Sequence, residues 1–185
     1  MIFVGLGNSG KEYEETRHNV GFKVIEKLRK DSRVMQVYRK KLFNGWEVEI
    51  EGKKIIIVKP KTYINESGKA VKDALDFFNK KIEDLFLIHD ELAIELGKIK
   101  ITKDKGPGGH KGVLSIIENL QSNNFVRIRI GIKGQKIEKS FVEYVLSPFL
   151  PEEKEIIEKV IEKSVNAIKE ILKSNLEKAM SLYNN

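Results

Sequence analysis

Apolar positions recur along the chain with two periods, and together they predict helices interleaved with strands. Helical spacing is clear over Val20–Lys30 and returns over Ser67–Phe78 and Gly112–Leu120. Short apolar runs bounded by glycine, proline or polar residues predict buried strands between these helices. The expected strands are Met1–Gly5, Lys54–Val58, Leu85–Ile88, Lys98–Ile101 and Val126–Ile132.

Turn signals predict one antiparallel hairpin inserted into this order. Asn44-Gly45 separates the apolar runs Val37–Phe43 and Trp46–Ile50, and this dipeptide is typical of a two-residue hairpin turn. Glu51-Gly52 predicts a second turn, which leads into the next strand.

The C-terminal part of the chain is expected to be helical. A short helix is predicted near Phe141–Leu146, and Pro151 opens a long amphipathic helix. Its apolar side carries Ile157, Ile161, Val165, Ile168 and Leu172. The whole pattern predicts an α/β fold, a single domain over residues 1–185 with a mixed, twisted sheet flanked by helices.

Composition narrows the class of protein. Hydrophobic residues make up 41% of the chain and charged residues 33%, which excludes a disordered chain. No apolar run approaches the ~18 residues of a membrane helix, and Gly5 interrupts the apolar start, so we expect neither a membrane span nor a signal peptide. The sequence has no cysteine, which excludes disulfides, thiolate metal sites and a cysteine nucleophile and fits a reducing compartment.

The net charge of +7 is unevenly distributed. From residue 151 onward the chain has six lysines and seven acidic residues, a net charge of −1. The first 150 residues therefore carry a net charge of +8. One interpretation is a general bias of the proteome toward lysine, glutamate and isoleucine. The other is a basic face on the main body that binds a polyanion such as nucleic acid.

The first glycine-rich segment has the glycine spacing of a dinucleotide-binding motif but not the secondary structure that should follow it. Gly5-Leu6-Gly7-Asn8-Ser9-Gly10 fits G-x-G-x-x-G, but that motif should open a helix directly. Here Lys11–Asn19 is polar and irregular, and the helix begins near Val20. A nicotinamide-dependent oxidoreductase is therefore a weak alternative, and the glycines serve either close approach to a ligand or a tight turn.

The three histidines supply the candidate chemistry. His89-Asp90 follows the strand that ends at Ile88, a usual place for site residues in open α/β sheets, and alternation directs these two side chains to opposite faces. A carboxylate can hold an imidazole in one tautomer, so Asp90 and His18 form a candidate general-base pair. The competing interpretations are local: Asp90 could cap a turn, and Asn19, beside His18, could cap the next helix.

Two further segments allow structural or chemical roles. Asn65 could cap the following helix, or its amide could bind a developing oxyanion. Residues 106–112, Gly-Pro-Gly-Gly-His-Lys-Gly, run into a helix whose N-terminus would attract an anion. His18, Asp90 and His110 could together hold a metal ion, although no compact ligand spacing supports this, and no G-x-S-x-G motif supports a serine nucleophile.

Five segments taken together point to one family. They are GLGNSGKEYEETRHNVG (5–21), KPKTYINESGKAV (59–71), HDEL (89–92), GPGGHKG (106–112) and FVRIRIGI (125–132). In this order and spacing, the chain resembles the bacterial-type peptidyl-tRNA hydrolase family. The resemblance implies a cytoplasmic, monomeric enzyme without metal or cofactor. It would cleave the ester between a peptide and the 3′ end of tRNA, and would require no membrane or protein partner.

The resemblance also implies roles for individual residues. It implies His18 as general base and Asp90 as its partner, and it implies substrate contacts by Asn8, Tyr13, Asn65 and His110. Lys111 occupies a further substrate-binding position. It further implies tRNA phosphate contacts by Arg129 and by a lysine near 102–105, for which we expect Lys103 or Lys105.

The chain departs from the family pattern at four positions. Ser9 replaces the usual proline, Ile64 a usual methionine, and Ala93 a common acid. Lys111 stands where asparagine is usual; because an amide both donates and accepts hydrogen bonds whereas lysine only donates, one substrate or water contact is in doubt. Lys111 could bind phosphate instead. A non-catalytic RNA-binding relative and a metallohydrolase therefore remain alternatives.

Overall fold

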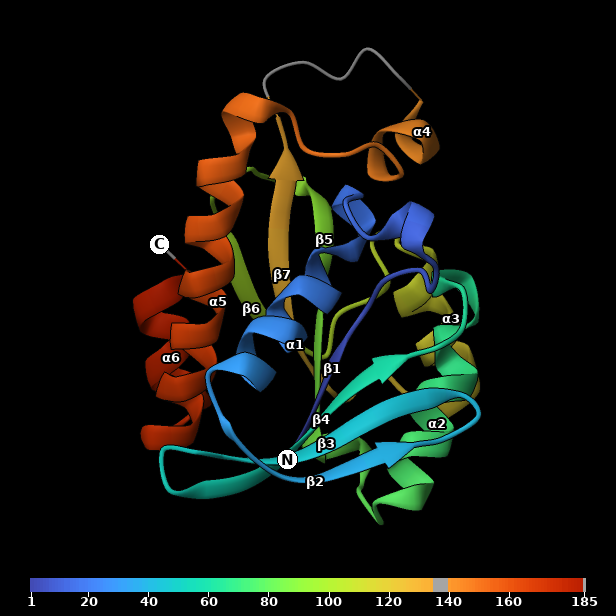
Figure 1. Ribbon diagram of the computed structural model, residues 1–185, viewed down its shortest axis with the longest axis vertical. Helices are drawn as coiled ribbons and strands as arrows, with labels where there is room; N and C mark the ends of the chain where they lie inside the picture. Colours follow the sequence, from blue (N-terminus) through green and yellow to red (C-terminus); the bar gives the residue numbers. More distant parts are fainter. Residues whose placement is uncertain (135–139, 185) are drawn as a thin grey trace.

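Seven strands form one mixed sheet within residues 1–134 and 140–184, which the computed structural model describes (Figure 1). The strand order is β2-β3-β4-β1-β5-β7-β6. The strands β4, β1, β5 and β7 are parallel, and antiparallel pairing adds β3 and β2 at one edge and β6 at the other. The strands are β1 Ile2–Gly5, β2 Arg33–Arg39, β3 Phe43–Ile50, β4 Lys53–Pro60, β5 Leu85–Glu95, β6 Ile99–Lys103 and β7 Val126–Lys133.

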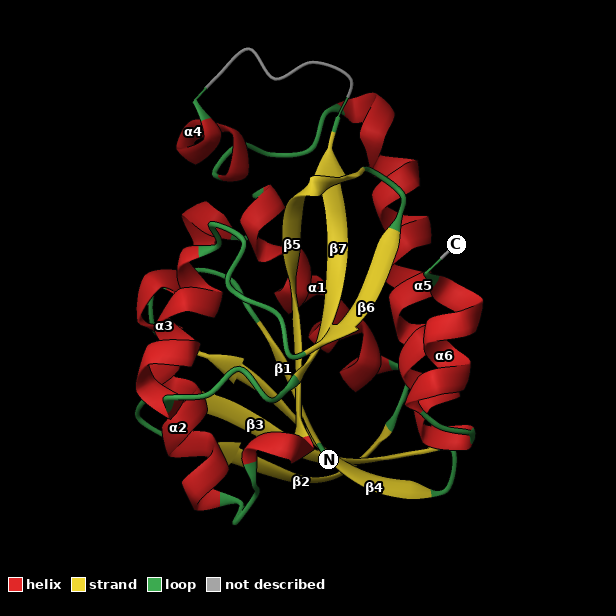
Figure 2. Ribbon diagram, turned by 180° about the vertical axis from the view of Figure 1, so that it is seen from behind, coloured by secondary structure: helices red, strands yellow, loops and turns green. Residues whose placement is uncertain are grey.

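Helices pack on both faces of the sheet (Figures 1 and 2). On one face lie α1 Val20–Lys30, α5 Lys154–Lys173 and α6 Leu176–Tyr183. On the other lie α2 Ser67–Phe77 and α3 Lys111–Leu120. The short α4, Phe141–Val145, lies beyond the carboxyl ends of β5 and β7. Among the described helices, none combines the length and the apolar character that crossing a bilayer requires.

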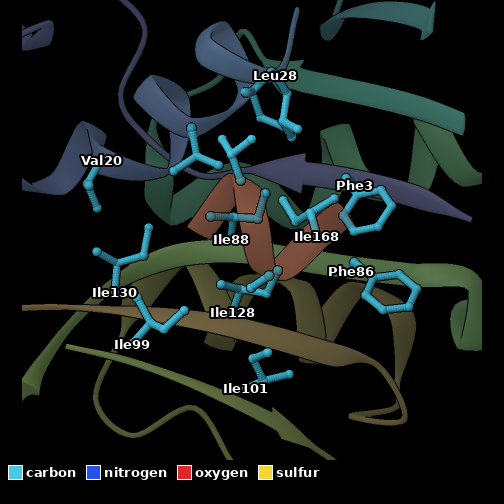
Figure 3. Packing of buried hydrophobic residues seen from close by; sticks show 14 of the residues in the cluster. Phe3, Val20, Leu28, Phe86, Ile88, Ile99, Ile101, Ile128, Ile130 and Ile168 are labelled. Carbon is cyan, nitrogen blue, oxygen red and sulfur yellow. The ribbon is translucent and has the colours of Figure 1, made fainter. Parts of the chain in front are cut away.

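Alternation along the strands divides the core into two layers. Phe3 packs in the layer under α1 and α5, while Ile2 and Val4 pack in the layer under α2 and α3. Figure 3 shows the first layer, where Phe3, Ile88 and Ile168 meet from β1, β5 and α5. Burial on both faces explains why the parallel strands are continuous apolar runs in the sequence. The predicted α/β fold with a mixed, helix-flanked sheet is confirmed.

The predicted hairpin turn at Asn44-Gly45 is wrong. Both residues lie inside β3, opposite Arg39 and Tyr38 of β2, and the turn covers residues 40–42. Phe43, fully buried under α2, sets the register, because a shift by one residue would turn it to solvent. Gly45 fits this place, since a Cβ there would lie 3.1 Å from the ring of Phe78.

The predicted strand end at Ile88 is also wrong. The strand β5 continues to Glu95, and Asp90 and Glu91 pair in register with Ile130 and Gly131 of β7. The polar residues that suggested a loop stay in the strand because each has a partner, as described below. Toward the C-terminus, Pro151 opens a 3₁₀ turn before α5. The helix α5 ends at Lys173, and a separate helix, α6, follows it.

The first glycine-rich loop serves helix packing. A Cβ on Gly5 would lie 2.3 Å from the carbonyl oxygen of Gly21, so only glycine lets α1 pack this closely on β1. Asn19 does not cap α1; its side chain accepts a hydrogen bond from the Asn8 amide (2.8 Å) and donates to the Asn8 carbonyl (3.0 Å). Nor does Asn65 cap α2, which begins at Ser67 without a side-chain cap.

Candidate active site

A pocket of about 660 Å³ is lined by residues of β5, of the start of α3 and of α4. Its walls come from the loop after β1, the segment before α2, the glycine-rich loop before α3, and α4 itself. Six of the residues expected at a site line it: Asn8, His18, Asn65, Asp90, His110 and Lys111. The fold therefore brings together side chains that lie up to 103 positions apart in the sequence.

Two histidines converge on one oxygen of Asp90. His18 Nδ1 lies 2.8 Å from Asp90 Oδ1, and His110 Nε2 lies 2.9 Å from the same atom. Burial by itself would raise the pKa of the Asp90 carboxyl, but the facing imidazoles of His18 and His110 hold that pKa well below its usual range. Asp90 is therefore a carboxylate, and because a carboxylate only accepts hydrogen bonds, both ring nitrogens donate to it.

The environment of His110 fixes its tautomer from the opposite side. Its Nδ1 accepts hydrogen bonds from the backbone N–H groups of Gly112 (3.1 Å) and Val113 (3.2 Å). Nδ1 therefore carries no proton, and the single proton of the neutral ring is on Nε2, toward Asp90. His110 thus caps α3, so two of the N–H groups expected to attract an anion are already occupied.

His18 has the tautomer that a general base needs. With its Nδ1 proton donated to Asp90, its Nε2 carries the free lone pair. The side chain is 11% exposed and lines the pocket, so water can reach it. His18 comes from the 3₁₀ turn Arg17–Asn19, and Asp90 comes from the middle of β5, an interior strand that pairs with β1 and β7.

His89 lies behind this pair. It is fully buried, its Nδ1 lies 2.6 Å from the carbonyl oxygen of Asp90, and its ring packs edge-on against His110 at 4.7 Å. Burial, and then the proximity of His110, lower the pKa of His89 well below its usual value. Only Asp90 of the two neighbours lines the pocket, as strand alternation predicts.

The expected substrate residues differ in how they reach the pocket. Asn8 Oδ1 accepts a hydrogen bond from the backbone of Ile64 (2.8 Å), which ties the first loop to the segment that carries Asn65. Asn65 is exposed on the pocket wall. Tyr13 does not line the pocket; its ring packs edge-on to Tyr63, 6.2 Å away, which does.

The residues expected to bind phosphate lie outside the pocket. Arg129 on β7 pairs through Nη2 and Nε with Glu91 Oε2, at 2.9 and 3.0 Å. Lys103 ends β6, Lys105 lies in the loop that follows, and both are exposed. Arg129 therefore has a carboxylate partner that a phosphate would have to share.

Comparison with known proteins assigns the chain to a family. The family model for peptidyl-tRNA hydrolase matches residues 2–185. The chain belongs to the peptidyl-tRNA hydrolase family. The resemblance inferred from five sequence segments is thereby confirmed.

Individual relatives agree over most of the chain. A peptidyl-tRNA hydrolase of Thermodesulfovibrio yellowstonii is 44% identical over 190 residues, which cover 100% of this chain and 98% of that protein. One from Aquifex aeolicus is 44% identical over 156 residues, covering 84% and 81%. The crystal structure of the Acinetobacter baumannii peptidyl-tRNA hydrolase superposes with a TM-score of 0.89 at 30% identity, covering 97% of this chain and 92% of that one.

Within this peptidyl-tRNA hydrolase fold, the His-Asp-His cluster has the donor types of a metal site. One ligand atom each from His18, Asp90 and His110 lie within 4.8 Å of one another. A histidine that binds a metal through Nε2 carries its proton on Nδ1 and donates it. Because His110 Nδ1 instead accepts two backbone hydrogen bonds, the proton is on the nitrogen that would have to bind the metal. These residues do not fit a metal ion in this arrangement.

Sequence reasoning missed one wall of the pocket. This wall is formed by apolar side chains of α4 and of the residue after it: Phe141, Val142, Val145 and Leu146. Phe141 is 69% exposed. The spacing of these residues predicts a helix but does not indicate what the helix faces. An apolar residue that lines an open pocket and one that is exposed to solvent occupy the same kind of position on a helix, so the sequence cannot distinguish them. Glu91 was also missed as the partner of Arg129, since the contact joins two strands.

Proposed function

We propose that this chain hydrolyses the ester between the peptide and the 3′ end of tRNA in peptidyl-tRNA, and so releases tRNA for reuse. The observation that carries the proposal is the His18–Asp90 pair, whose free Nε2 belongs to a side chain lining an open pocket. Membership of the peptidyl-tRNA hydrolase family supports the substrate.

The proposed reaction is attack by water with His18 as general base. Neutral His18 takes a proton through Nε2 while the water oxygen bonds to the ester carbonyl carbon. Asp90 holds the Nδ1 proton and stabilises the imidazolium that forms. The bond to the ribose oxygen then breaks, and the proton passes to the leaving 3′ hydroxyl. Water, His18 and Asp90 supply every step, so the proposal needs neither a covalent intermediate nor a cofactor.

The remaining pocket residues position the substrate in this proposal. The Asn65 amide donates to the oxyanion of the tetrahedral intermediate. Asn8, whose Oδ1 is already engaged, contacts the substrate through Nδ2, and Tyr13 acts by supporting Tyr63. His110 holds the Asp90 carboxylate from its second side. Lys111, exposed at the start of α3, offers an ammonium group to the oxyanion or to a terminal phosphate.

The tRNA body is proposed to bind through its phosphates. Lys103, Lys105 and Arg129 supply cations outside the pocket, and such contacts fix register without reading sequence, as an enzyme acting on all tRNAs requires. The register of β6 and β7 places Lys100 directly opposite Arg129, which adds a fourth cation. We propose that the protein acts as a cytoplasmic monomer, because one chain holds the complete set of residues named here and its substrate belongs to translation.

The decisive test is release of the acyl group from N-acetyl-aminoacyl-tRNA in the presence of EDTA. The wild type should turn over, and His18→Ala should lower the rate by about 10²–10⁴-fold, the usual contribution of a general base. The matched control is binding of uncharged tRNA, which His18→Ala should leave unchanged. Loss of wild-type activity in EDTA would instead indicate a metallohydrolase, and equal rates for the two proteins would exclude His18 as the base.

Lys111 favours one second candidate, a relative that binds tRNA without turnover. It replaces the asparagine usual in the family with a side chain that cannot accept a hydrogen bond. Tight binding of tRNA with no acyl release would favour this function. In that case Lys111→Asn would be the next variant, and recovered turnover would identify the lysine as the cause.

A further inference from the structure

We propose that Arg17 is a positioning residue for His18, and that its buried ion pair with Glu153 attaches the general base to the segment that forms the α4 wall of the pocket. The inference rests on the proposed function, because it assigns a role to Arg17 through the base. Arg17 does not line the pocket.

The ion pair lies inside the protein. The Arg17 side chain is 3% exposed and that of Glu153 is 9% exposed, and Nη2 lies 2.5 Å from Oε2. The guanidinium is stacked between two aromatic rings, with its central carbon 4.4 Å from the centre of Tyr144 and 4.8 Å from that of Phe149. Of the guanidinium nitrogens, Nη2 binds the carboxylate, while Nε and Nη1 are buried without a hydrogen-bond partner, so the planar contact with the two rings holds the group in a way that a compact ammonium could not reproduce.

The backbone around Arg17 is attached to the same segment. The Arg17 amide donates to the carbonyl of Ser147 (3.0 Å), and Thr16 forms an isolated antiparallel bridge with Pro148. His18 is the next residue, in a 3₁₀ turn of only three residues. Because so short a turn has little internal support, the position of His18 depends on what holds Arg17.

The partners of Arg17 are anchored to the sheet. The Tyr144 hydroxyl donates to the carbonyl of Ile132 (2.7 Å) and accepts from the amide of Gly134 (2.8 Å), at the end of β7. Glu153 Oε2 also accepts from the amide of Leu150 (2.8 Å). A Cβ on Gly134 would lie 2.6 Å from Glu153 Oε1, so these groups are in close contact.

One support therefore serves two parts of the pocket lining. Tyr144 belongs to α4, and its neighbour Val145 lines the pocket, as His18 does. Arg17 joins this helix to the turn that carries His18. A displacement of about 1 Å at a reacting group can cost on the order of 10²-fold in rate, so small changes in the support should appear in the chemical step.

The test is a set of single-turnover hydrolysis rates with enzyme in excess over N-acetyl-aminoacyl-tRNA. Arg17→Lys keeps the charge but not the planar group that packs on the two rings, and Glu153→Gln keeps the shape but not the charge. Each should lower the rate about 10-fold while the affinity for uncharged tRNA stays within twofold. Glu15→Gln is the matched control, because it removes the exposed Glu15–Lys23 pair two residues before Arg17 and should leave the rate unchanged.

The His18→Ala background separates positioning from general stability. If Arg17 acts through His18, Arg17→Lys should not lower the residual rate of His18→Ala any further. An equal 10-fold loss in both backgrounds, or a normal rate for Arg17→Lys with wild-type His18, would overturn the inference. Circular dichroism melts should show each variant folded at the assay temperature. A wild type that releases no acyl group would refute the proposed function itself, a result distinct from any behaviour of the Arg17 variants.

Discussion

At the scale of single residues, hydrogen bonds determine which ring nitrogen of His18 and of His110 carries the proton. Asp90 accepts from two rings, and the α3 N–H groups require His110 to carry its proton on the side facing Asp90. Because the lone pair of His110 Nδ1 is engaged by two backbone N–H groups, the ring nitrogen of these two histidines that keeps a free lone pair, within the described residues, is His18 Nε2. The N-terminus of α3 thereby directs the His110 proton toward a carboxylate on β5.

His89 should make the protein lose stability in mild acid. Its pKa is lowered in the folded state, so below pH ~6.5 the unfolded chain binds a proton that the folded chain does not, and stability rises with pH in this window. His89 should contribute a slope of up to about 1.4 kcal/mol per pH unit.

Urea unfolding of the wild type and His89→Asn between pH 5 and 7.5 checks this expectation. Asparagine keeps a donor for the Asp90 carbonyl but does not titrate. The variant should be less stable than the wild type at pH 7.5, and this difference in the free energy of unfolding should shrink as the pH falls, because only the wild type loses the contribution of His89. Parallel curves for the two proteins would show that His89 contributes nothing to acid sensitivity.

The sequence could indicate candidate reacting residues but not their supports. His18 and Asp90 lie in segments whose residues match a family, so both could be named as candidates. Arg17 and Asn19 flank His18, yet their partners Glu153 and Asn8 lie 136 and 11 positions away. Local patterns assign such residues to caps or surface, because only the folded chain brings the partners together.

At the scale of elements, the two edges of the sheet are protected in different ways. At β6, Asn184 accepts a hydrogen bond from the Ile101 amide (2.6 Å) and donates to the Ile101 carbonyl (2.9 Å), as a neighbouring strand would. At β2, the register shifts between Val34 and Gln36, which interrupts a regular edge. Both features oppose pairing with another chain.

Asn184→Ala should therefore destabilise the C-terminal layer. Loss of two part-buried hydrogen bonds is expected to lower the free energy of unfolding by about 1–3 kcal/mol. Urea unfolding measures this directly, with Asn123→Ala, at an exposed asparagine in a loop, as the matched control. Equal midpoints for the two variants would show that Asn184 is not part of the sheet's stability.

The elements themselves follow from the sequence where burial and local signals agree. The helix α1 was predicted to the residue, because its apolar spacing and the packing on β1 require the same face. The Asn44-Gly45 turn failed because burial of Phe43 outweighs a local turn preference. The predicted strand ends at Ile88, seven residues before β5 does, because the polar run His-Asp-Glu is typical of a strand end unless its buried partners are known.

At the scale of the whole molecule, the excess of positive charge lies outside the C-terminal helices. Along β7, Ile128 and Ile130 face α5, so Arg127 and Arg129 lie on the opposite face. Figure 2 shows this face of β5, β7 and β6 between α3 and α6 with no helix in front of it. The C-terminal segment, with its net charge of −1, packs on the other face together with α1. The excess of +8 in the first 150 residues is therefore consistent with a basic face near the pocket.

This asymmetry predicts which lysines determine the salt dependence of tRNA binding. The logarithm of affinity should fall with the logarithm of salt concentration, by roughly 0.7–0.9 per neutralised phosphate. Lys103→Gln and Lys105→Gln should each reduce that slope by about one such increment if the residue contacts phosphate. Lys178→Gln, at an exposed lysine on α6 in the other layer, should leave it unchanged. Fluorescence anisotropy with labelled tRNA across 50–300 mM KCl gives the slopes, over a range in which the screening length falls from about 14 Å to about 6 Å. If all three variants gave the same reduction, binding would reflect total charge, and no basic face would be needed.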